Sequence, residues 1–208
     1  MLKRKIVSLL CVIVLFVMNS ISVTAMAGDL NDEGAAVTST ITITDPETGH
    51  VWESEIPSKD LKIRRTPGNY VFDGSFEETV MVSVDIGEYI RETLPRTRAT
   101  ADQTITDGMT IKTGMTYNYS GQNVRITAVS GATTPKGLYY AENRKQYYRH
   151  PGTSAGGSWT PTTNSWKYIV DSGYGLYVSS APPKAILDCT IRVAGMSAFR
   201  KVSVTCSL

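Results

Sequence analysis

Strict alternation of apolar and polar residues over residues 37–44 is the feature that most constrains the fold of this chain. One alternate set contains valine, serine and two isoleucines, and the other contains four threonines, so the two sets face opposite sides of a β-strand. The following residues 45–49, Asp-Pro-Glu-Thr-Gly, have the composition of a turn. Residues 50–56 then have the pattern of a returning strand. This segment is therefore predicted to form a β-hairpin.

Short β-prone segments separated by turn residues continue to the C-terminus. Glycines punctuate the middle of the chain, and strands do not alternate with long amphipathic helices. This pattern predicts a mainly β protein, an antiparallel β-sandwich of the immunoglobulin-like class, although the Cys…Trp…Cys spacing of that class is absent. The strands expected after the first hairpin cover residues 61–65, 79–85, 104–105, 109–112, 115–119, 124–129, 166–171, 174–178, 186–194 and 199–208.

One short helix is expected near residues 85–94. Asp85 has the side chain of an N-cap, and Glu88 three residues later completes a capping-box pattern. Apolar residues follow at helical spacing until Pro95 ends the run. The helix is thus predicted to make about two to three turns.

The N-terminus has the composition of a secretory signal. Three basic residues at positions 3–5 precede an apolar run over residues 6–18, and the sequence Ala-Met-Ala ends at Ala27. We therefore expect residues 1–27 to be removed at Ala27 and the mature protein to be secreted. No membrane span is expected after removal, because no second apolar run approaches the roughly 20 residues that a span requires.

Charge divides the rest of the chain into two unlike parts. Residues 28–95 carry 5 basic and 14 acidic side chains, a net charge of −9, whereas residues 96–208 carry 13 basic and 5 acidic ones, a net charge of +8. Such an asymmetry bears on partners and self-association rather than on fold. The expected organisation is a flexible acidic N-terminus at 28–36, a small acidic β-rich subdomain at 37–94, a linker at 95–103 and a basic all-β domain at 104–208.

Removal of the signal leaves two cysteines, Cys189 and Cys206, in a compartment that favours disulfides. The strands expected around them form a hairpin, and pairing Cys189 with Cys206 gathers apolar residues on one face and polar residues on the other. We therefore expect an intrachain disulfide, with two free thiols or a bond to another chain as alternatives. No metal site or cofactor is expected, because the cysteine spacing and the two histidines fit no ligand set.

Aromatic and basic residues are concentrated in residues 138–150, where thirteen positions hold four tyrosines and three fixed positive charges. Aromatic rings stack on sugars, and lysine and arginine neutralise anionic groups, so this composition suits a glycan, an anionic polymer or an acidic protein. The alternative is that many of these tyrosines are core residues of strands. The candidate contact residues are Tyr139, Tyr140, Arg144, Lys145, Tyr147, Tyr148, Arg149, Trp159 and Trp166.

Two patterns associated with hydrolysis occur without their usual context. Residues 152–156 spell G-x-S-x-G around Ser154, but a nucleophile elbow needs a strand before it and a helix after it, and this pattern lies between loop-like stretches. Glu53 and Glu55 lie two apart on one strand face, a carboxylate pair that also fits an ordinary solvated face. The chain is therefore not expected to be an enzyme.

These observations favour a secreted, non-enzymatic binding module for glycans or anionic envelope polymers. A second hypothesis is a pro-protein, in which a protease cuts near Arg96 or Arg98 and releases a basic effector or toxin from the acidic part. A hydrolase that uses Ser154 or the pair of glutamates ranks last. An intracellular nucleic-acid partner is not expected for a secreted chain.

Overall fold

The computed structural model describes residues 37–66, 76–87, 89, 109–195, 197 and 199–208. These residues form twelve β-strands and two short 3₁₀ turns, η1 and η2. Their bounds are β1 Thr38–Thr44, β2 Val51–Glu55, η1 Ser58–Asp60, β3 Leu61–Thr66, β4 Phe76–Asp85, β5 Thr110–Ser120, β6 Asn123–Thr134, β7 Tyr139–His150, η2 Pro151–Thr153, β8 Ala155–Trp159, β9 Ser165–Ile169, β10 Gly175–Leu176, β11 Lys184–Val193 and β12 Phe199–Ser207.

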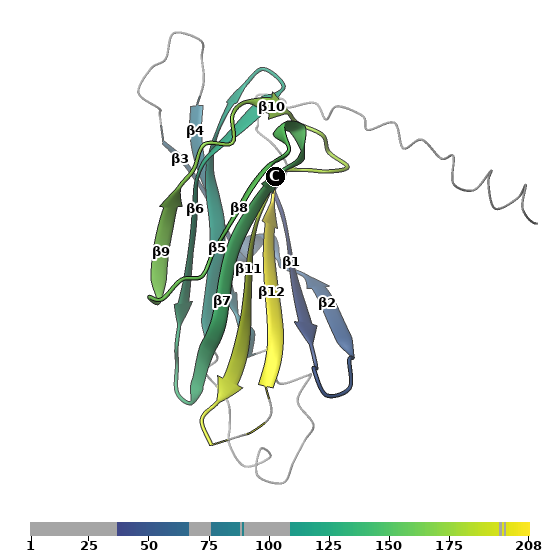
Figure 1. The fold of residues 1–208 in the computed structure, drawn as a ribbon, viewed down its shortest axis with the longest axis vertical. Helices are drawn as coiled ribbons and strands as arrows, with labels where there is room; N and C mark the ends of the chain where they lie inside the picture. The colour runs from purple at the N-terminus through teal and green to yellow at the C-terminus, as the bar shows by residue number, and fades with distance from the viewer. Residues whose placement is uncertain (1–36, 67–75, 88, 90–108, 196, 198) are drawn as a thin grey trace, which may run out of the picture.

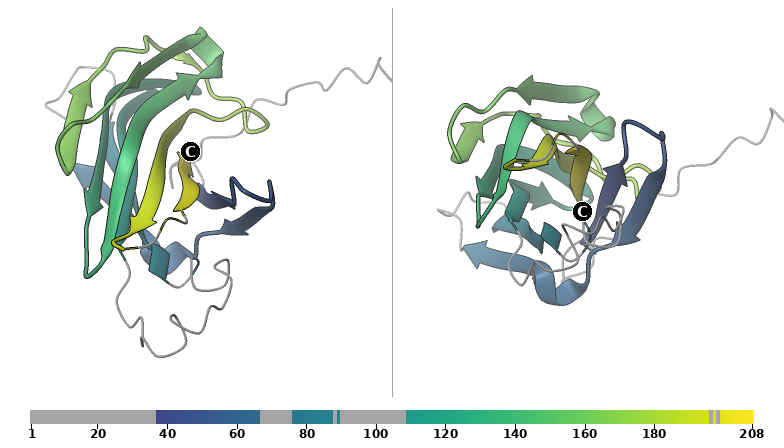
Figure 2. Two further views of the ribbon diagram at one scale, coloured as in Figure 1. Left: turned by 60° about the horizontal axis from the view of Figure 1, so that its bottom comes forward. Right: turned by 90° about the horizontal axis from the view of Figure 1, so that it is seen from below.

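The strands build two sheets that face each other across one core (Figures 1 and 2). The first sheet has the strand order β2-β1-β12-β11-β7-β8. The second has the order β10-β6-β5-β4-β3, and β9 also pairs with β6. Every pairing between these strands is antiparallel. The predicted antiparallel β-sandwich is therefore confirmed.

Alternation along the strands builds the core between the sheets. Ile41 and Ile43 of β1 are buried, while the threonines between and beside them are partly exposed on the outer face. β4 buries Val80, Val82 and Val84 in the same way. Because a period of two matches the pleat, each of these side chains leaves water when the sheets close, which stabilises the fold by about 1.5–3 kcal/mol per residue.

The acidic and basic parts of the sequence are not separate units of the fold. β1 pairs with β12 along its whole length, and β4 pairs with β5 along its whole length. Each sheet therefore contains strands from both sides of residues 95–103. One shared sandwich replaces the expected acidic subdomain at 37–94 and basic domain at 104–208.

The first hairpin turns where the sequence predicts, with Gly49 at a φ of +72°. Asp45 accepts a hydrogen bond from the backbone N–H of Glu47 at 2.9 Å, and its carboxylate forms a buried ion pair with Arg200 of β12 at 3.3 Å. The hydrogen bond from Glu47, and to a lesser degree the Arg200 guanidinium, hold the pKa of Asp45 below its usual value. This turn is thus anchored to the neighbouring strand by charge.

The expected helix near residues 85–94 is described at Ile86, Gly87 and Tyr89. Asp85 caps it as predicted, since the backbone N–H of Gly87 donates to Oδ1 of Asp85 at 2.9 Å. No helix in the described part of the chain is long and apolar enough to cross a membrane.

Several expectations fall on residues outside the described ranges. They are the signal at 1–27 with its cleavage site at Ala27, the N-terminus at 28–36, the linker at 95–103, and the processing sites Arg96 and Arg98.

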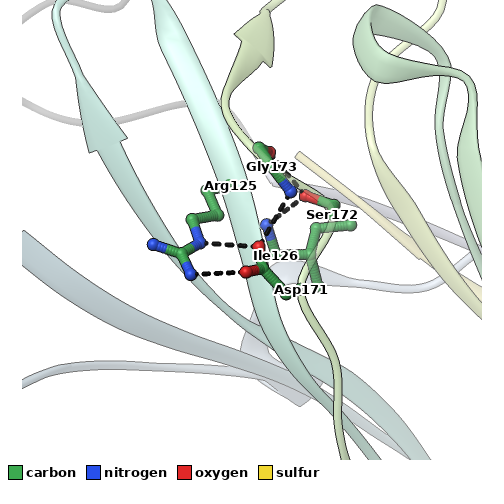
Figure 3. Close-up of polar contacts among 5 residues, drawn as sticks. All are labelled: Arg125, Ile126, Asp171, Ser172 and Gly173. Atoms are coloured by element: carbon green, nitrogen blue, oxygen red, sulfur yellow. Dashed lines mark hydrogen bonds and ion pairs between the residues drawn. The ribbon is translucent and has the colours of Figure 1, made fainter.

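A polar cluster ties the segment between β9 and β10 to β6 (Figure 3). Arg125 and Asp171 form a bidentate ion pair, with nitrogen–oxygen distances of 2.8 and 2.7 Å. Ser172 accepts a hydrogen bond from the backbone N–H of Ile126 at 2.8 Å, where the ladder between strands is interrupted. Gly173 has a φ of +67° and donates its N–H to Asp171. These contacts let the chain bend between β9 and β10 while it stays attached to the sheet.

The hairpin that carries the two cysteines forms, but in a different register from the one expected. Cys206 lies opposite Ala185, and Cys189 lies opposite Val202. The residue opposite Cys189 is therefore Val202, four positions before the expected Cys206. Because four is an even number, both cysteines still lie on the inner face. At a rise of about 3.3 Å per residue the cysteines are about 13 Å apart along the strands, beyond the reach of a disulfide. The predicted disulfide is thus wrong for this structure, in which both thiols are free and buried.

Alkylation with mass spectrometry tests the state of Cys189 and Cys206. Burial raises the pKa of each thiol to about 12, so little reactive thiolate exists in the folded protein at neutral pH. We expect neither cysteine to react with iodoacetamide in the native state, and both to react in denaturant without a reductant. Peptide mapping locates the labels. Labelling that requires prior reduction would show instead that the two cysteines are joined.

Candidate functional site

β7 is a strand that the sequence analysis does not anticipate, and it divides the aromatic and basic segment between two environments. Gln146 and Tyr148 lie on the inner face and are 0% and 6% exposed. Lys145, Tyr147 and Arg149 alternate with them and therefore lie on the outer face of the first sheet. In the sequence, the signal for this surface is the alternation along residues 145–149, because every second residue of a strand faces the same side.

β8, the edge strand beside β7, presents almost no side chains to this surface. Gly156 lies opposite Arg149 on the outer face and adds no side chain to the surface at that position. Gly157 faces inward, where an added Cβ would lie 2.8 Å from the Trp159 ring and 3.0 Å from the Tyr148 ring. The two glycines thus leave the outer face open and give the rings beneath it room to pack.

Together these strands form a shallow, open depression of about 460 Å³, which we name the β7–β8 hollow. β7 contributes Lys145, Tyr147 and Arg149 to it, β8 contributes glycines and Ser158, and β11 contributes Asp188. Lys184 of β11 lies next to Arg149 in the register. Three cations therefore lie in or beside the hollow with one carboxylate, so that the surface attracts anions.

Asp188 and Tyr147 form the polar centre of the hollow. Burial of its ring, and then the Asp188 carboxylate to which it hydrogen-bonds, raise the pKa of Tyr147 to about 12. The phenol is consequently neutral across the physiological range and can donate a hydrogen bond. Oδ1 of Asp188 is buried and has no hydrogen-bond partner within the described ranges.

The structure removes several predicted contact residues from the surface. Tyr139, Tyr148 and Trp166 are each at most 9% exposed and belong to the core. The alternative interpretation, that many aromatic residues of this segment are core residues of strands, is correct for these three side chains.

Trp159 also faces inward, between two other rings. Its ring stacks on Tyr148 at a centroid distance of 6.0 Å and on Tyr168 at 4.8 Å, with interplanar angles of 15° and 9°. Because Tyr168 belongs to β9, this stack joins the edge of the first sheet to the edge of the second. Trp159 therefore closes one side of the sandwich.

Arg144 and Tyr140 do not line the hollow. Arg144 donates hydrogen bonds to Thr133 at 3.1 Å and to Asn164 at 2.8 Å, so it braces the turn that precedes β9. Tyr140 is exposed on the outer face, but it lies opposite Arg192 and does not line the hollow. Of the predicted contact residues, the structure gathers Lys145, Tyr147 and Arg149 in one exposed surface.

Gln146 is the inward neighbour of these residues, and the sequence analysis does not identify it. Its amide nitrogen donates to the Ile186 carbonyl at 3.0 Å and to the Thr113 hydroxyl at 3.2 Å. Its amide oxygen accepts a hydrogen bond from the Trp166 indole at 3.2 Å. Gly131 lies so close that an added Cβ would be 2.7 Å from this oxygen. The amide therefore fixes the strand from which the hollow is built.

The patterns associated with hydrolysis do not assemble into an active site. Ser154 lies in the turn between β7 and β8, with a φ of +59°, and a strand rather than a helix follows it. His150 is fully buried, and its Nε2 contacts the Val124 carbonyl at 2.7 Å. Glu53 and Glu55 lie on the exposed edge strand β2. Within the described ranges, no group of three or more His, Cys, Asp or Glu side chains could hold a metal ion.

The interaction of Tyr147 with Asp188 is testable by titration. In Asp188→Asn the negative charge is lost while burial remains, so we expect the pKa of Tyr147 to fall from about 12 and to stay above its ordinary value. Nuclear magnetic resonance of ¹³Cζ-labelled tyrosine measures it, with Tyr147→Phe to assign the signal. An unchanged pKa in Asp188→Asn would contradict the contact.

Comparison with known proteins adds no family to this description. No protein-family model, no curated protein and no solved structure matches the chain. The proposals that follow therefore rest on sequence and geometry.

Proposed function

We propose that the protein is a secreted binding module that holds an anionic polymer on the β7–β8 hollow. The observation that carries this proposal is the outward alternation of Lys145, Tyr147 and Arg149 beside an edge strand of small residues. Two exposed cationic side chains flank a neutral phenol there, and the glycine-rich strand leaves room for a chain to lie across the sheet. The signal-like N-terminus supports an extracellular role.

The geometry favours an anionic polymer over a neutral glycan. Sugar recognition by stacking needs exposed aromatic faces, but Tyr148 and Trp166 are buried and Trp159 is sandwiched between two rings, which leaves Tyr147 as the one partly exposed ring among the described residues of the hollow. The charged groups remain accessible, since both Lys145 and Arg149 are exposed. Phosphate, sulfate or carboxylate groups on a flexible chain can pair with such cations, and salt weakens the attraction.

Substitution of the two exposed cations tests the proposal. We expect the protein to be retained on dextran sulfate at low salt and not on neutral dextran. Lys145→Gln or Arg149→Gln should each weaken binding by about threefold to tenfold, because each removes one charge-assisted contact. In a plot of the logarithm of affinity against the logarithm of salt concentration, the slope should become less steep by about one unit for each cation removed. Fluorescence anisotropy with labelled dextran sulfate measures both quantities.

Lys167→Gln is the matched control, because Lys167 is exposed on β9 of the other sheet and does not line the hollow. It removes the same charge from the protein and should leave binding nearly unchanged. An equal loss in Lys167→Gln would show that net charge rather than the hollow is responsible. Absence of retention at low salt would refute the proposal, and equal retention on neutral dextran would identify the ligand as a glycan.

The topology argues against the release of a basic effector from an acidic pro-segment. β1 to β4 lie before the proposed cleavage sites at Arg96 and Arg98, and they are paired with β12 and β5 in the two sheets. Their removal would take Ile41, Ile43 and the valines of β4 out of the shared core. A cut in the connection would therefore leave the two fragments joined by strand pairing and by the core.

Limited trypsin digestion tests this expectation. After cleavage near Arg96 or Arg98, we expect both fragments to elute together in native size-exclusion chromatography and to separate only in denaturant. Elution of the basic fragment alone under native conditions would support the pro-protein hypothesis instead.

A further inference from the structure

A second concavity lies on the other side of the sandwich, where the β1–β2 hairpin, dark blue in Figure 2, faces the second sheet. Its volume is about 480 Å³, within the range of about 300–1,000 Å³ that is usual for small-molecule sites. We name it the β2–β4 cleft, and its principal residues are Ile41, Ile43, Trp52, Asp60, Asp85 and Tyr89.

The cleft has an apolar floor made of core residues. Ile41 and Ile43 come from β1 and Val84 comes from β4, and all three also belong to the core. Trp52 lies opposite Ile43 on β2 and is half-buried, so part of its indole stays accessible. The ring of His50 contacts that indole edge to face at a centroid distance of 4.2 Å, which restrains its orientation.

Acidic residues predominate around this floor. Among the described residues that line the cleft, Glu53, Asp60 and Asp85 are acidic and Lys59 is the one basic residue. Local structure sets the positions of two of them: the backbone N–H of Asp60, at the end of η1, donates to the Pro57 carbonyl, and Asp85 caps the turn that carries Tyr89. The lining thus combines a net negative charge with aliphatic and aromatic surface.

We propose that the β2–β4 cleft binds a small organic cation, an ammonium or guanidinium group carried on an apolar stem. The stem contacts the half-buried side chains of Trp52 and Tyr89 above this floor, where burial of apolar surface contributes to affinity. The cationic group pairs with Asp60 or Asp85 and lies over the indole of Trp52, to which cations are attracted by the quadrupole of the ring. This inference is independent of the anionic polymer proposed for the β7–β8 hollow.

Charge and shape together select this class of ligand. A neutral molecule of the same shape gains the apolar contact but leaves the carboxylates without a counter-charge, and an anion is repelled by them. The volume accommodates a ligand of one ring and a short chain more readily than a folded partner.

Three matched probes test the cleft by nuclear magnetic resonance of the ¹⁵N-labelled protein. They are 2-phenylethylammonium, neutral 2-phenylethanol and anionic 3-phenylpropanoate. We expect the ammonium probe to shift the indole N–H signal of Trp52 saturably, while the signals of Trp159 and Trp166, which do not line the cleft, stay in place. The signal of Trp52 is assigned with Trp52→Phe. The alcohol should bind more weakly, and the acid should not bind.

Substitutions then distinguish binding in the cleft from attraction by the net charge of the whole protein. Asp60→Asn should weaken binding of the ammonium probe about twofold to fivefold, the effect of losing one partly exposed ion pair. Asp85→Asn provides a second test, because asparagine caps a helix as well as aspartate does. Glu55→Gln is the control, since it removes the same charge from β2 outside the cleft and should leave affinity unchanged.

Each other outcome overturns the proposal. Equal affinities for the ammonium and the alcohol would show an apolar site without charge selection. Equal effects of Glu55→Gln and Asp60→Asn would show attraction by the whole protein. A shift of the Trp52 signal on dilution without any probe would show that a second copy of the chain occupies the cleft.

Discussion

The side-chain amide of Gln146 is buried between the two sheets and is bonded on all sides. It joins β7 to β5 through Thr113, to β9 through Trp166 and to β11 through the Ile186 carbonyl. A buried amide without partners would cost about 1–3 kcal/mol, so these bonds favour one placement of β7 over its alternatives. Once Gln146 points inward, the pleat directs Lys145 and Tyr147 outward. The candidate surface is therefore a consequence of the core beneath it.

Charge is distributed unevenly along the chain, and strand pairing distributes it unevenly across the first sheet. β2 with its glutamates lies at one edge of the first sheet, and β7 and β8 lie at the other, because β1 pairs with β12. Between them, the outer face of β1 and β12 consists largely of serines and threonines. In the first sheet, the glutamates of β2 and the cations of β7 thus lie at opposite edges, although strands of both parts of the sequence are paired in between. Such a separation suits two sites that attract ligands of opposite charge.

The sequence predicted which faces of the strands are buried better than which strands are neighbours. In the hairpin of Cys189 and Cys206, the inner and outer faces follow from the period of two, whereas a shift by an even number of residues preserves both faces. The turn decides the register, and Gly195 at a φ of +84° belongs to a geometry that the pattern alone does not specify. β8 lacks strand propensity, since glycine is unfavourable in strands, and only its pairing with β7 makes it extended. Lys145 and Arg149 were identified from composition, but Asp188 joins them only through strand pairing.

The glycines of β8 keep the candidate surface open but destabilise the edge of the first sheet. Each glycine in a strand loses more backbone entropy on folding than a larger residue would, which weakens an edge that already lacks an outer partner. Gly157 is nevertheless favoured, because a Cβ there would force the rings of Tyr148 and Trp159 to shift. Those rings continue to Tyr168 on the opposite sheet, and stacked aromatic pairs contribute about 0.5–1.5 kcal/mol each beyond their buried area. The ring stack therefore offsets the weakness that the glycines introduce, and the outer face at Gly156 can remain free of side chains.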